Sequence, residues 1–386
     1  MKVNRLEEKV RRLTSEDAGV ESRIPGLVLM SQTRHAPENV LSVAHDSVDE
    51  NTVFWIASVT KIMTTVGALM CVERGLIELD SVVTVVLPEL RQLRVLEGFG
   101  ADEIFKLADR DGPITLRQLL THSSGIGYDI LNPDLLQCRA GIPKSLCGKL
   151  DTAFFDLPLV YQPGASWQYG AGIEWAGILI ERLNGNVRLG KFLEENIWIP
   201  LGIESTTFHL EDRPDLTHRL ATLSNRTADE ILTVDSPPLY PHPARDDSGG
   251  AGAYSTPADV MKFLQAILTA DPRLLRSQSF EEMFQPQLAD PTHLKKSLQN
   301  PLYQVGMACA LPDGTPMNFG LGGLLSLSDL DMGRKAGSMQ WGGYPNLGWW
   351  IDRVGGLCGF YCSQLIPACD QVSMDLKWDF ERAMYA

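Results

Sequence analysis

The chain has 386 residues, a length that suits one large α/β unit or two lobes sharing a cleft. With 44% hydrophobic and 21% charged residues it has the composition of a globular protein, which excludes disordered, collagen-like and coiled-coil proteins. The formal net charge of -14 offers no positive surface to a nucleic-acid backbone or an anionic membrane, so neither is expected as a partner.

The amino-terminal residues mix charged and apolar side chains and contain no apolar core of a signal peptide. Apolar stretches such as residues 64–72 end well before the about 18 residues that a membrane span needs. These patterns predict a soluble, cytoplasmic protein. The 7 cysteines are scattered and never spaced as CxxC, which favours reduced, mostly buried thiols over a metal site or disulfides.

The first predicted elements are an amphipathic helix over residues 4–18 and two strands, at residues 27–30 and about 39–46. From Ser58 the pattern changes to a helix over residues 59–74, which a glycine ends.

The stretch from about 76 to 240 is typical of short helices broken by Pro and Gly, and the clearest of them covers residues 174–184. Another helix is predicted over residues 257–270, with proline in its first turn. The remaining predicted elements are strands followed by one helix: residues 304–311, 337–341, 347–352, 356–364 and the helix 372–385.

Strands thus occur near both ends of the sequence, and the middle is mostly helical. We therefore expect a single catalytic unit over residues 1–386 of α/β type, more closely α+β. One antiparallel sheet would form a lobe from residues of about 1–57 and 300–386, and residues of about 76–240 would form a helical lobe. The cleft between the lobes is the expected site.

The chain lacks a GxSxG elbow, an HExxH helix, a Walker loop and a complete GxGxxG. It does contain an SxxK motif, formed by Ser58 and Lys61 at the start of a predicted helix. Unpaired N–H groups and the positive end of a helix favour a developing anion there. Lys61 lies on the same helix face, so its neutral amine could take the serine proton. The alternative is an ordinary helix start, with Ser58 as a cap and Lys61 in solvent.

Two further segments follow in chain order. Tyr169 precedes a predicted helix, where its phenol can project into a cleft. Trp341 leads into Gly342 and Gly343, where a backbone N–H can approach a substrate closely. Taken alone, Tyr169 reads more simply as a packed aromatic residue and the two glycines as a turn.

Longer motifs accompany these residues. LLTHSSGI at residues 119–126 and GGAGAYST at residues 249–256 resemble the LLTHTSGL and GAGGLYST of class C β-lactamases and family VIII esterases, a branch of the serine β-lactamase and penicillin-binding protein superfamily. Within that branch the chain is most similar to the fungal lovastatin side-chain acyltransferases, which are transesterases. That similarity rests on VLEGF at residues 95–99, YGA with EWAG within 169–177, and GGYPN at 342–346.

The resemblance implies the fold of this superfamily, with an antiparallel sheet built from both termini, flanking helices and a mostly helical second lobe. It implies that Ser58 is the acylated nucleophile and that Lys61 and Tyr169 form the acid/base pair. The N–H groups of Ser58 and Tyr344 would form the oxyanion hole, which stabilises charge that develops in the transition state. Tyr128 matches a pocket tyrosine of the acyltransferases and is expected to contact the acyl donor or acceptor.

His122 invites a triad interpretation, but its motif is structural in this superfamily, so a buried scaffold histidine is expected. Two departures from the β-lactamases concern the substrate. Where those enzymes have Lys-Thr-Gly, this chain has Trp341, Gly342 and Gly343, and so lacks the cation that pairs with a drug carboxylate. Where they have Tyr-x-Asn, it has Ala171, which cannot hydrogen-bond a substrate amide. Both changes favour an ester or thioester substrate, bound beside the Trp-Gly-Gly segment.

The sequence therefore predicts an acyltransferase of secondary metabolism that moves an acyl group through acyl-Ser58 to a hydroxyl of a bulky natural product. The donor would be an acyl thioester, for example on an acyl carrier protein of a polyketide synthase, and no cofactor or metal is expected. One alternative is a family VIII-like esterase that hydrolyses carboxylic esters. Another is an inactive penicillin-binding-like protein, which the intact set of Ser58, Lys61 and Tyr169 disfavours.

Overall fold

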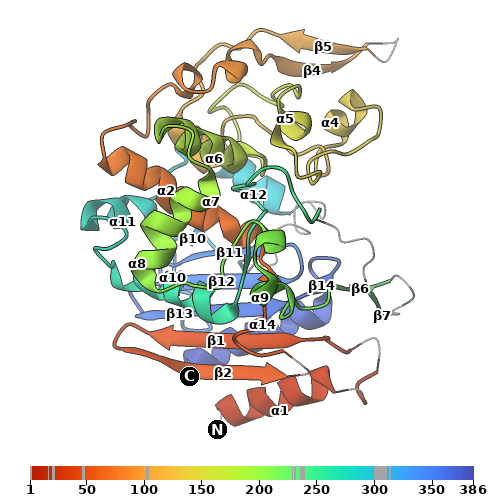
Figure 1. Ribbon diagram of the computed structural model, residues 1–386, viewed down its shortest axis with the longest axis vertical. Helices are drawn as coiled ribbons and strands as arrows, with labels where there is room; N and C mark the ends of the chain where they lie inside the picture. The colour runs from red at the N-terminus through yellow and green to blue at the C-terminus, as the bar shows by residue number, and fades with distance from the viewer. Residues whose placement is uncertain are drawn as a thin grey trace.

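The computed structural model describes residues 2–15, 17–19, 22–45, 48–100, 104–227, 229, 232–234, 240–299, 311–312 and 314–386. A 7-stranded sheet, in which neighbouring strands run antiparallel, joins the two ends of the sequence (Figure 1). In spatial order its strands are β2 (Ala36–His45), β1 (Leu27–Thr33), β13 (Leu357–Ser363), β12 (Leu347–Asp352), β11 (Met339–Gly343), β10 (Leu324–Ser326) and β9 (Met317–Phe319).

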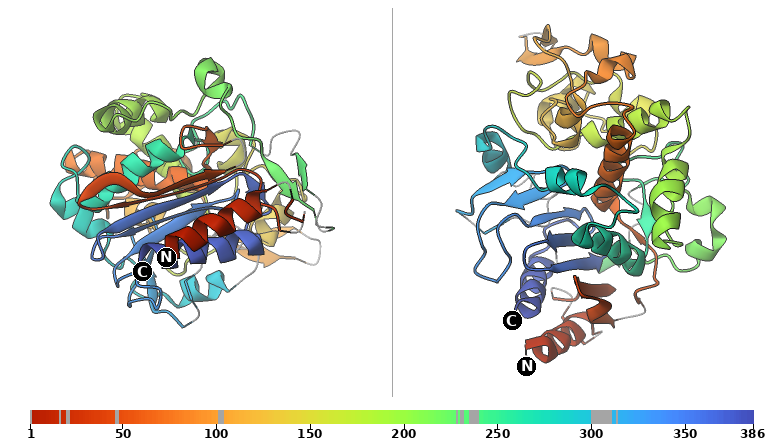
Figure 2. Two further views of the ribbon diagram at one scale, coloured as in Figure 1. Left: turned by 90° about the horizontal axis from the view of Figure 1, so that it is seen from below. Right: turned by 90° about the vertical axis from the view of Figure 1, so that its left-hand side faces the viewer.

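The sheet is covered on both faces, and this explains why its central strands are apolar almost throughout. Helices α1 (Lys2–Thr14) and α14 (Gln371–Met384) lie side by side on one face (Figure 2). Helix α10 (Pro257–Thr269) packs on β1 and β13 from the other face. Successive side chains of β1 point to opposite faces of the sheet. Leu27 and Leu29 belong to the cluster with α1 and α14, whereas Val28 and Met30 belong to the main core.

The central helix of the other part of the molecule is α2 (Thr60–Glu73), which packs against α6 (Gly172–Leu183). Nearly every residue of α2 is buried, as expected of a helix that is enclosed on all sides. Gly67 permits the close packing, because a Cβ there would come within 3.1 Å of Leu193 and 3.3 Å of Ile180. The side chain of Lys61, on this helix, is therefore held inside the protein.

Shorter elements surround these two helices. The other α-helices in the described residues are α3 (Leu116–Leu120), α4 (Pro133–Cys138), α5 (Leu150–Phe154), α7 (Leu189–Leu193), α8 (Ile199–Leu201), α9 (Pro214–Thr217), α11 (Ser277–Met283) and α12 (Thr292–Leu298). Small sheets pair β3 (Phe54–Trp55) with β8 (Tyr254–Ser255), β4 (Val95–Phe99) with β5 (Phe105–Ala108), and β6 (Ser224–Arg226) with β7 (Leu232–Val234) and β14 (Leu365–Ile366).

The expected antiparallel sheet is confirmed, including the strand predicted at residues 347–352. The first helix was predicted to reach residue 18 but ends at Thr14, whose hydroxyl bonds back to the Val10 carbonyl at 3.0 Å. The strand predicted at 304–311 lies outside the described residues except for its last residue, which is in no strand. Strands β4 to β7 within residues 76–240 were not predicted.

Across the described ranges, no helix combines the length and the apolar character that crossing a bilayer requires.

Candidate active site

Ser58 lies in a tight turn that precedes α2. The 3-10 turn η1 (Ala57–Val59) leads directly into the helix. Ala57 has a φ of 43°, in the left-handed region that residues other than glycine rarely adopt. The hydroxyl of Thr60 donates to the Ala57 carbonyl at 2.7 Å and thereby holds the turn. The Ser58 side chain caps neither η1 nor α2, so its oxygen is directed to other partners.

Lys61 is 3% exposed and supplies one of those partners. Its Nζ donates to Ser58 Oγ at 3.2 Å and to the Gly250 carbonyl at 2.7 Å. Its Nζ also lies 4.8 Å from the ring centroid of Tyr169 and 5.4 Å from that of Tyr128, within the range of a cation–π contact. The alternative of a solvated Lys61 is therefore wrong.

Tyr169 supplies the second partner from the loop before α6. Its hydroxyl donates to Ser58 Oγ at 2.6 Å, while its ring packs 5.2 Å from that of Trp341. Gly170 allows this placement, because a Cβ there would overlap the Ile126 carbonyl. Ser58, Lys61 and Tyr169 thus meet at one oxygen, and either the amine or the phenol is close enough to exchange a proton with it.

His122 belongs to the support of this group. It is 3% exposed, its Nδ1 accepts from the Gly170 N–H at 3.4 Å, and its ring centroid lies 4.7 Å from that of Tyr169. Burial, helped by the charge of Lys61, holds the pKa of His122 well below its usual value, so the ring is neutral. The structure places it behind Tyr169 as a scaffold residue, with no hydrogen bond to Ser58.

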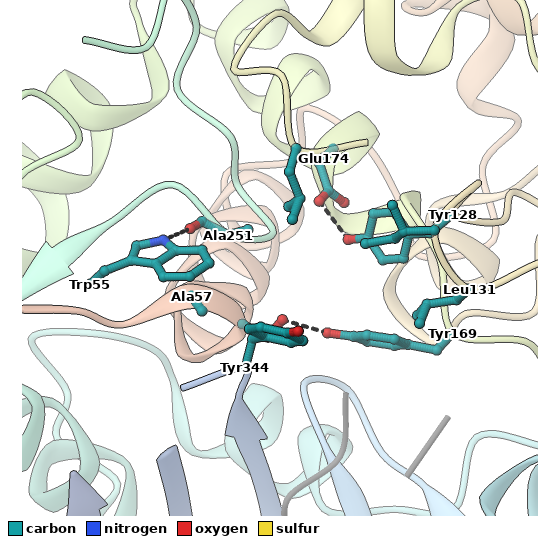
Figure 3. A pocket seen from close by; sticks show the side chains of 11 residues that line it. Trp55, Ala57, Tyr128, Leu131, Tyr169, Glu174, Ala251 and Tyr344 are labelled. Carbon is teal, nitrogen blue, oxygen red and sulfur yellow. Dashed lines mark hydrogen bonds between the residues drawn. The ribbon is translucent and has the colours of Figure 1, made fainter. Parts of the chain in front are cut away.

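A small pocket with a volume of about 60 Å³ lies over the serine. Figure 3 shows its walls, which are mostly apolar or aromatic. The lining residues are Trp55, Ala57, Ser58, Tyr128, Ile130, Leu131, Leu146, Tyr169, Glu174, Ala251 and Tyr344.

Tyr344 follows the last residue of β11 and faces the same pocket (Figure 3). The end of β11 lies against the turn that carries Ser58, since a Cβ on Gly343 would come within 2.8 Å of the Ile56 carbonyl. Tyr344 and Ser58 therefore line the same pocket, and the oxyanion-hole role of the Tyr344 N–H stays a prediction.

In the described part of the chain, no three His, Cys, Asp or Glu side chains are grouped so that they could hold a metal ion.

A model of the family described as Beta-lactamase matches residues 6–368. The chain belongs to the β-lactamase family. It is an enzyme of the serine β-lactamase-related superfamily, and several of its relatives are fungal acyltransferases and esterases. Monacolin J acid methylbutanoyltransferase of Aspergillus terreus is 38% identical over 95% of this chain and 93% of the relative. Lovastatin esterase of Penicillium rubens is 37% identical over 86% and 85% of the two chains.

The fold has a solved counterpart in a mutant simvastatin synthase of Aspergillus terreus. The two structures superpose with a TM-score of 0.90 at 37% identity, covering 100% of this chain and 96% of the other. The family and the fold that the sequence motifs indicated are therefore confirmed.

Three further residues expected to contact the substrate lie in the sheet. Trp341, Gly342 and Gly343 are buried in β11, and none of them lines the pocket. Trp341 is 2% exposed and contacts the site through Tyr169, donating to its hydroxyl at 3.5 Å. The structure thus shows Trp341 supporting the phenol from behind.

Sequence reasoning missed Glu174, which projects into the pocket from the first turn of α6. Glu174 is 2% exposed and accepts a hydrogen bond from the Tyr128 hydroxyl at 2.5 Å. Burial raises the pKa of Glu174, although the Lys61 charge and the Tyr128 bond oppose the rise, and burial also raises the pKa of Tyr128. The available signal was one acidic residue in an otherwise apolar run, with Ile173 before it and Trp175 after it.

Proposed function

We propose that this protein is an acyltransferase that moves an acyl group from a thioester to an alcohol through an acyl-Ser58 intermediate. The observation that carries the proposal is the meeting of Lys61 and Tyr169 at Ser58 Oγ, 3.2 and 2.6 Å away, on the wall of a largely apolar pocket. A serine hydroxyl needs such a neighbouring base to become nucleophilic.

In the first half-reaction, which begins with one member of the Lys61–Tyr169 pair deprotonated, Ser58 Oγ bonds to the thioester carbonyl carbon and its proton passes to that member. The negative charge that develops on the carbonyl oxygen would be met by the N–H groups of Ser58 and Tyr344. The carbon–sulfur bond then breaks, and the pair returns the proton to the leaving thiolate. The product is an ester on Ser58 and a free thiol.

In the second half-reaction the alcohol takes the place of the thiol. The Lys61–Tyr169 pair removes the proton of the alcohol, and its oxygen attacks the acyl-Ser58 carbonyl. The ester product leaves, and Ser58 regains its proton. No cofactor enters either half. We treat the chain as one catalytic unit, because the site draws on both the sheet and the helices. The Ser58 turn packs on β11 of the sheet, and α2, which carries Lys61, packs on α6.

The relatives suggest the class of substrate. Monacolin J acid methylbutanoyltransferase and ML-236A carboxylate methylbutanoyltransferase, 38% and 37% identical, are named for transfer of a short branched acyl group. The apolar lining, including Trp55, Leu131 and Leu146, suits a bulky apolar acceptor from secondary metabolism. As the donor we propose an acyl thioester carried by an acyl carrier protein.

Hydrolysis is the second candidate, and the similarity to lovastatin esterase favours it. The two functions differ only in what attacks acyl-Ser58. An apolar pocket orders water poorly and binds a large alcohol well, so we expect transfer to exceed hydrolysis by at least about tenfold, equivalent to about 1.4 kcal/mol in barrier height.

The deciding experiment starts from acyl-enzyme made with a butanoyl thioester. It is mixed with buffer alone or with a panel of polycyclic alcohols, and the acyl-enzyme mass is followed over time. Decay in buffer as fast as with every alcohol would make the protein an esterase. Ser58→Ala is the control and should acquire no acyl mass. An absence of adduct in the wild type, with thioesters and with a fluorophosphonate, would instead indicate an inactive binding protein.

A further inference from the structure

The carboxyl group of Glu174 lies inside the pocket with one oxygen unpaired. Its Oε1 accepts from the Tyr128 hydroxyl, and its Oε2 has no hydrogen-bond partner although it is buried. Figure 3 shows this pair on one side of the pocket and Tyr169 on another. A buried carboxylate oxygen without a partner is costly, so its retention calls for a physical reason.

The proton pathway proposed above does not supply that reason. Lys61 donates to Ser58 and to the Gly250 carbonyl, and its charge acts on Glu174 without a direct hydrogen bond between the two described side chains. The serine, the lysine and Tyr169 form a complete set without this carboxyl group.

The surrounding structure holds the carboxyl group in place. The Cα of Gly250 packs directly against it, and a Cβ there would overlap both carboxyl oxygens. Tyr128, 5% exposed, is fixed by edge-to-face contact with Phe154 at 5.9 Å and with Tyr169 at 5.6 Å. One oxygen is therefore tied to a rigid phenol, and the other is buried at the pocket wall without a hydrogen-bond partner.

We propose that Glu174 Oε2 accepts a hydrogen bond from an O–H or N–H group of the substrate, and that Glu174 is thereby a specificity-determining residue positioned by Tyr128. This inference rests on the proposed acyl transfer. The donor group has two possible sources, a second hydroxyl of the acceptor or an amide N–H in the thiol arm of the donor. In an apolar pocket a carboxylate rejects an otherwise matching substrate that leaves it unpaired.

The test compares substrates that differ only in this group. For the thioester arm, the butanoyl thioester of N-acetylcysteamine, which has an amide N–H, is paired with the butanoyl thioester of butanethiol. For the alcohol arm, a decalindiol is paired with the matching decalol. Each ratio of kcat/KM is measured for the wild type and for Glu174→Met, which keeps a side chain of similar length without the acceptor.

We expect the wild type to prefer the hydrogen-bonding member of one pair by about tenfold to a hundredfold, as for a hydrogen bond to a charged group. The arm that shows the preference identifies the source. Glu174→Met should reduce that ratio to about one, whereas Glu181→Gln, on the same helix but outside the pocket, should keep it. A wild type without preference in either arm, or a variant that slows both members equally, would overturn the proposal.

A binding measurement separates this inference from the proposed function. Calorimetric titration of Ser58→Ala with the decalindiol and the decalol measures their affinities without any catalysis. The rate of acylation by each thioester is measured on the wild type without an acceptor. Failure of every thioester to acylate Ser58 would refute the acyltransferase. Acylation with equal rates for both thioesters, together with equal affinities for both alcohols, would refute only the role of Glu174. If Glu174→Met does not fold, Glu174→Gln removes the charge, and an unchanged preference in it would overturn the proposal.

Discussion

Replacing Tyr169 with phenylalanine tests the proton pathway at its shortest contact. Tyr169→Phe deletes the hydroxyl that donates to Ser58 Oγ at 2.6 Å and keeps the ring that packs on His122 and Trp341. Loss of a general acid/base group costs roughly two to four orders of magnitude in rate, which corresponds to about 2.7 to 5.4 kcal/mol in the barrier to acylation. The loss of one hydrogen bond should lower the unfolding free energy by only about 1 kcal/mol.

The assay is the rate of acyl-enzyme formation by intact mass, with thermal unfolding measured on the same samples. An acylation rate within about threefold of the wild type would refute a proton-transfer role for the phenol. Combining the change with Lys61→Ala gives a second check. Because both groups act on one oxygen, the double variant should lose much less than the product of the single losses. Fully multiplicative losses would show two independent contributions.

Three further variants follow from the structure. Ser58→Ala should acquire no acyl mass yet unfold within a few degrees of the wild type, since its side chain caps no helix; an adduct in this variant would place the nucleophile elsewhere. Burial raises the pKa of Glu181 to about 7 in the folded state. The folded state therefore loses stability as the pH rises from the pKa of the unfolded chain to about 7. Because glutamine carries no charge, Glu181→Gln should raise the Tm at about pH 8 more than at about pH 5. An equal Tm difference at both pH values would contradict this. Arg334→Met leaves the buried Glu381 carboxylate without the 2.6 Å partner it has now, and denaturant unfolding should show a loss of about 3 to 5 kcal/mol, whereas a loss below about 1 kcal/mol would contradict the reasoning.

The sequence was sufficient for the features that depend on strong local patterns. Apolar runs bounded by glycine identified β12, and the SxxK spacing placed Lys61 on the helix face that carries Ser58. Tyr169 is far from these residues in sequence, and it was linked to them by family motifs rather than by periodicity. The structure brings the three side chains together, and their catalytic roles remain predictions.

Other features depend on tertiary packing that one sequence does not display. The side chain of Trp341, in β11, is buried and donates to the Tyr169 hydroxyl. The residue pattern alone does not show whether this side chain packs against Tyr169 or faces the pocket. Glu174 reads locally as the acidic first turn of a helix, and only the approach of Tyr128 and Gly250 makes it part of the pocket. Short strands such as β9 and β10 have too few residues for a recognisable alternation.

The pairing of β1 with β13 has a consequence for folding during synthesis. Leu27 pairs with Ser363, and Lys9 of α1 reaches Asp379 of α14 across 370 residues of sequence. Contacts of such high sequence separation close late, because the entropic cost of a long loop must be met before they form. Until β13 leaves the ribosome, β1 has β2 as its only neighbour in the sheet, with an apolar edge exposed. We therefore expect nascent chains that stop before β13 to depend on chaperones, and the helices around α2 and α6 to gain protease resistance first.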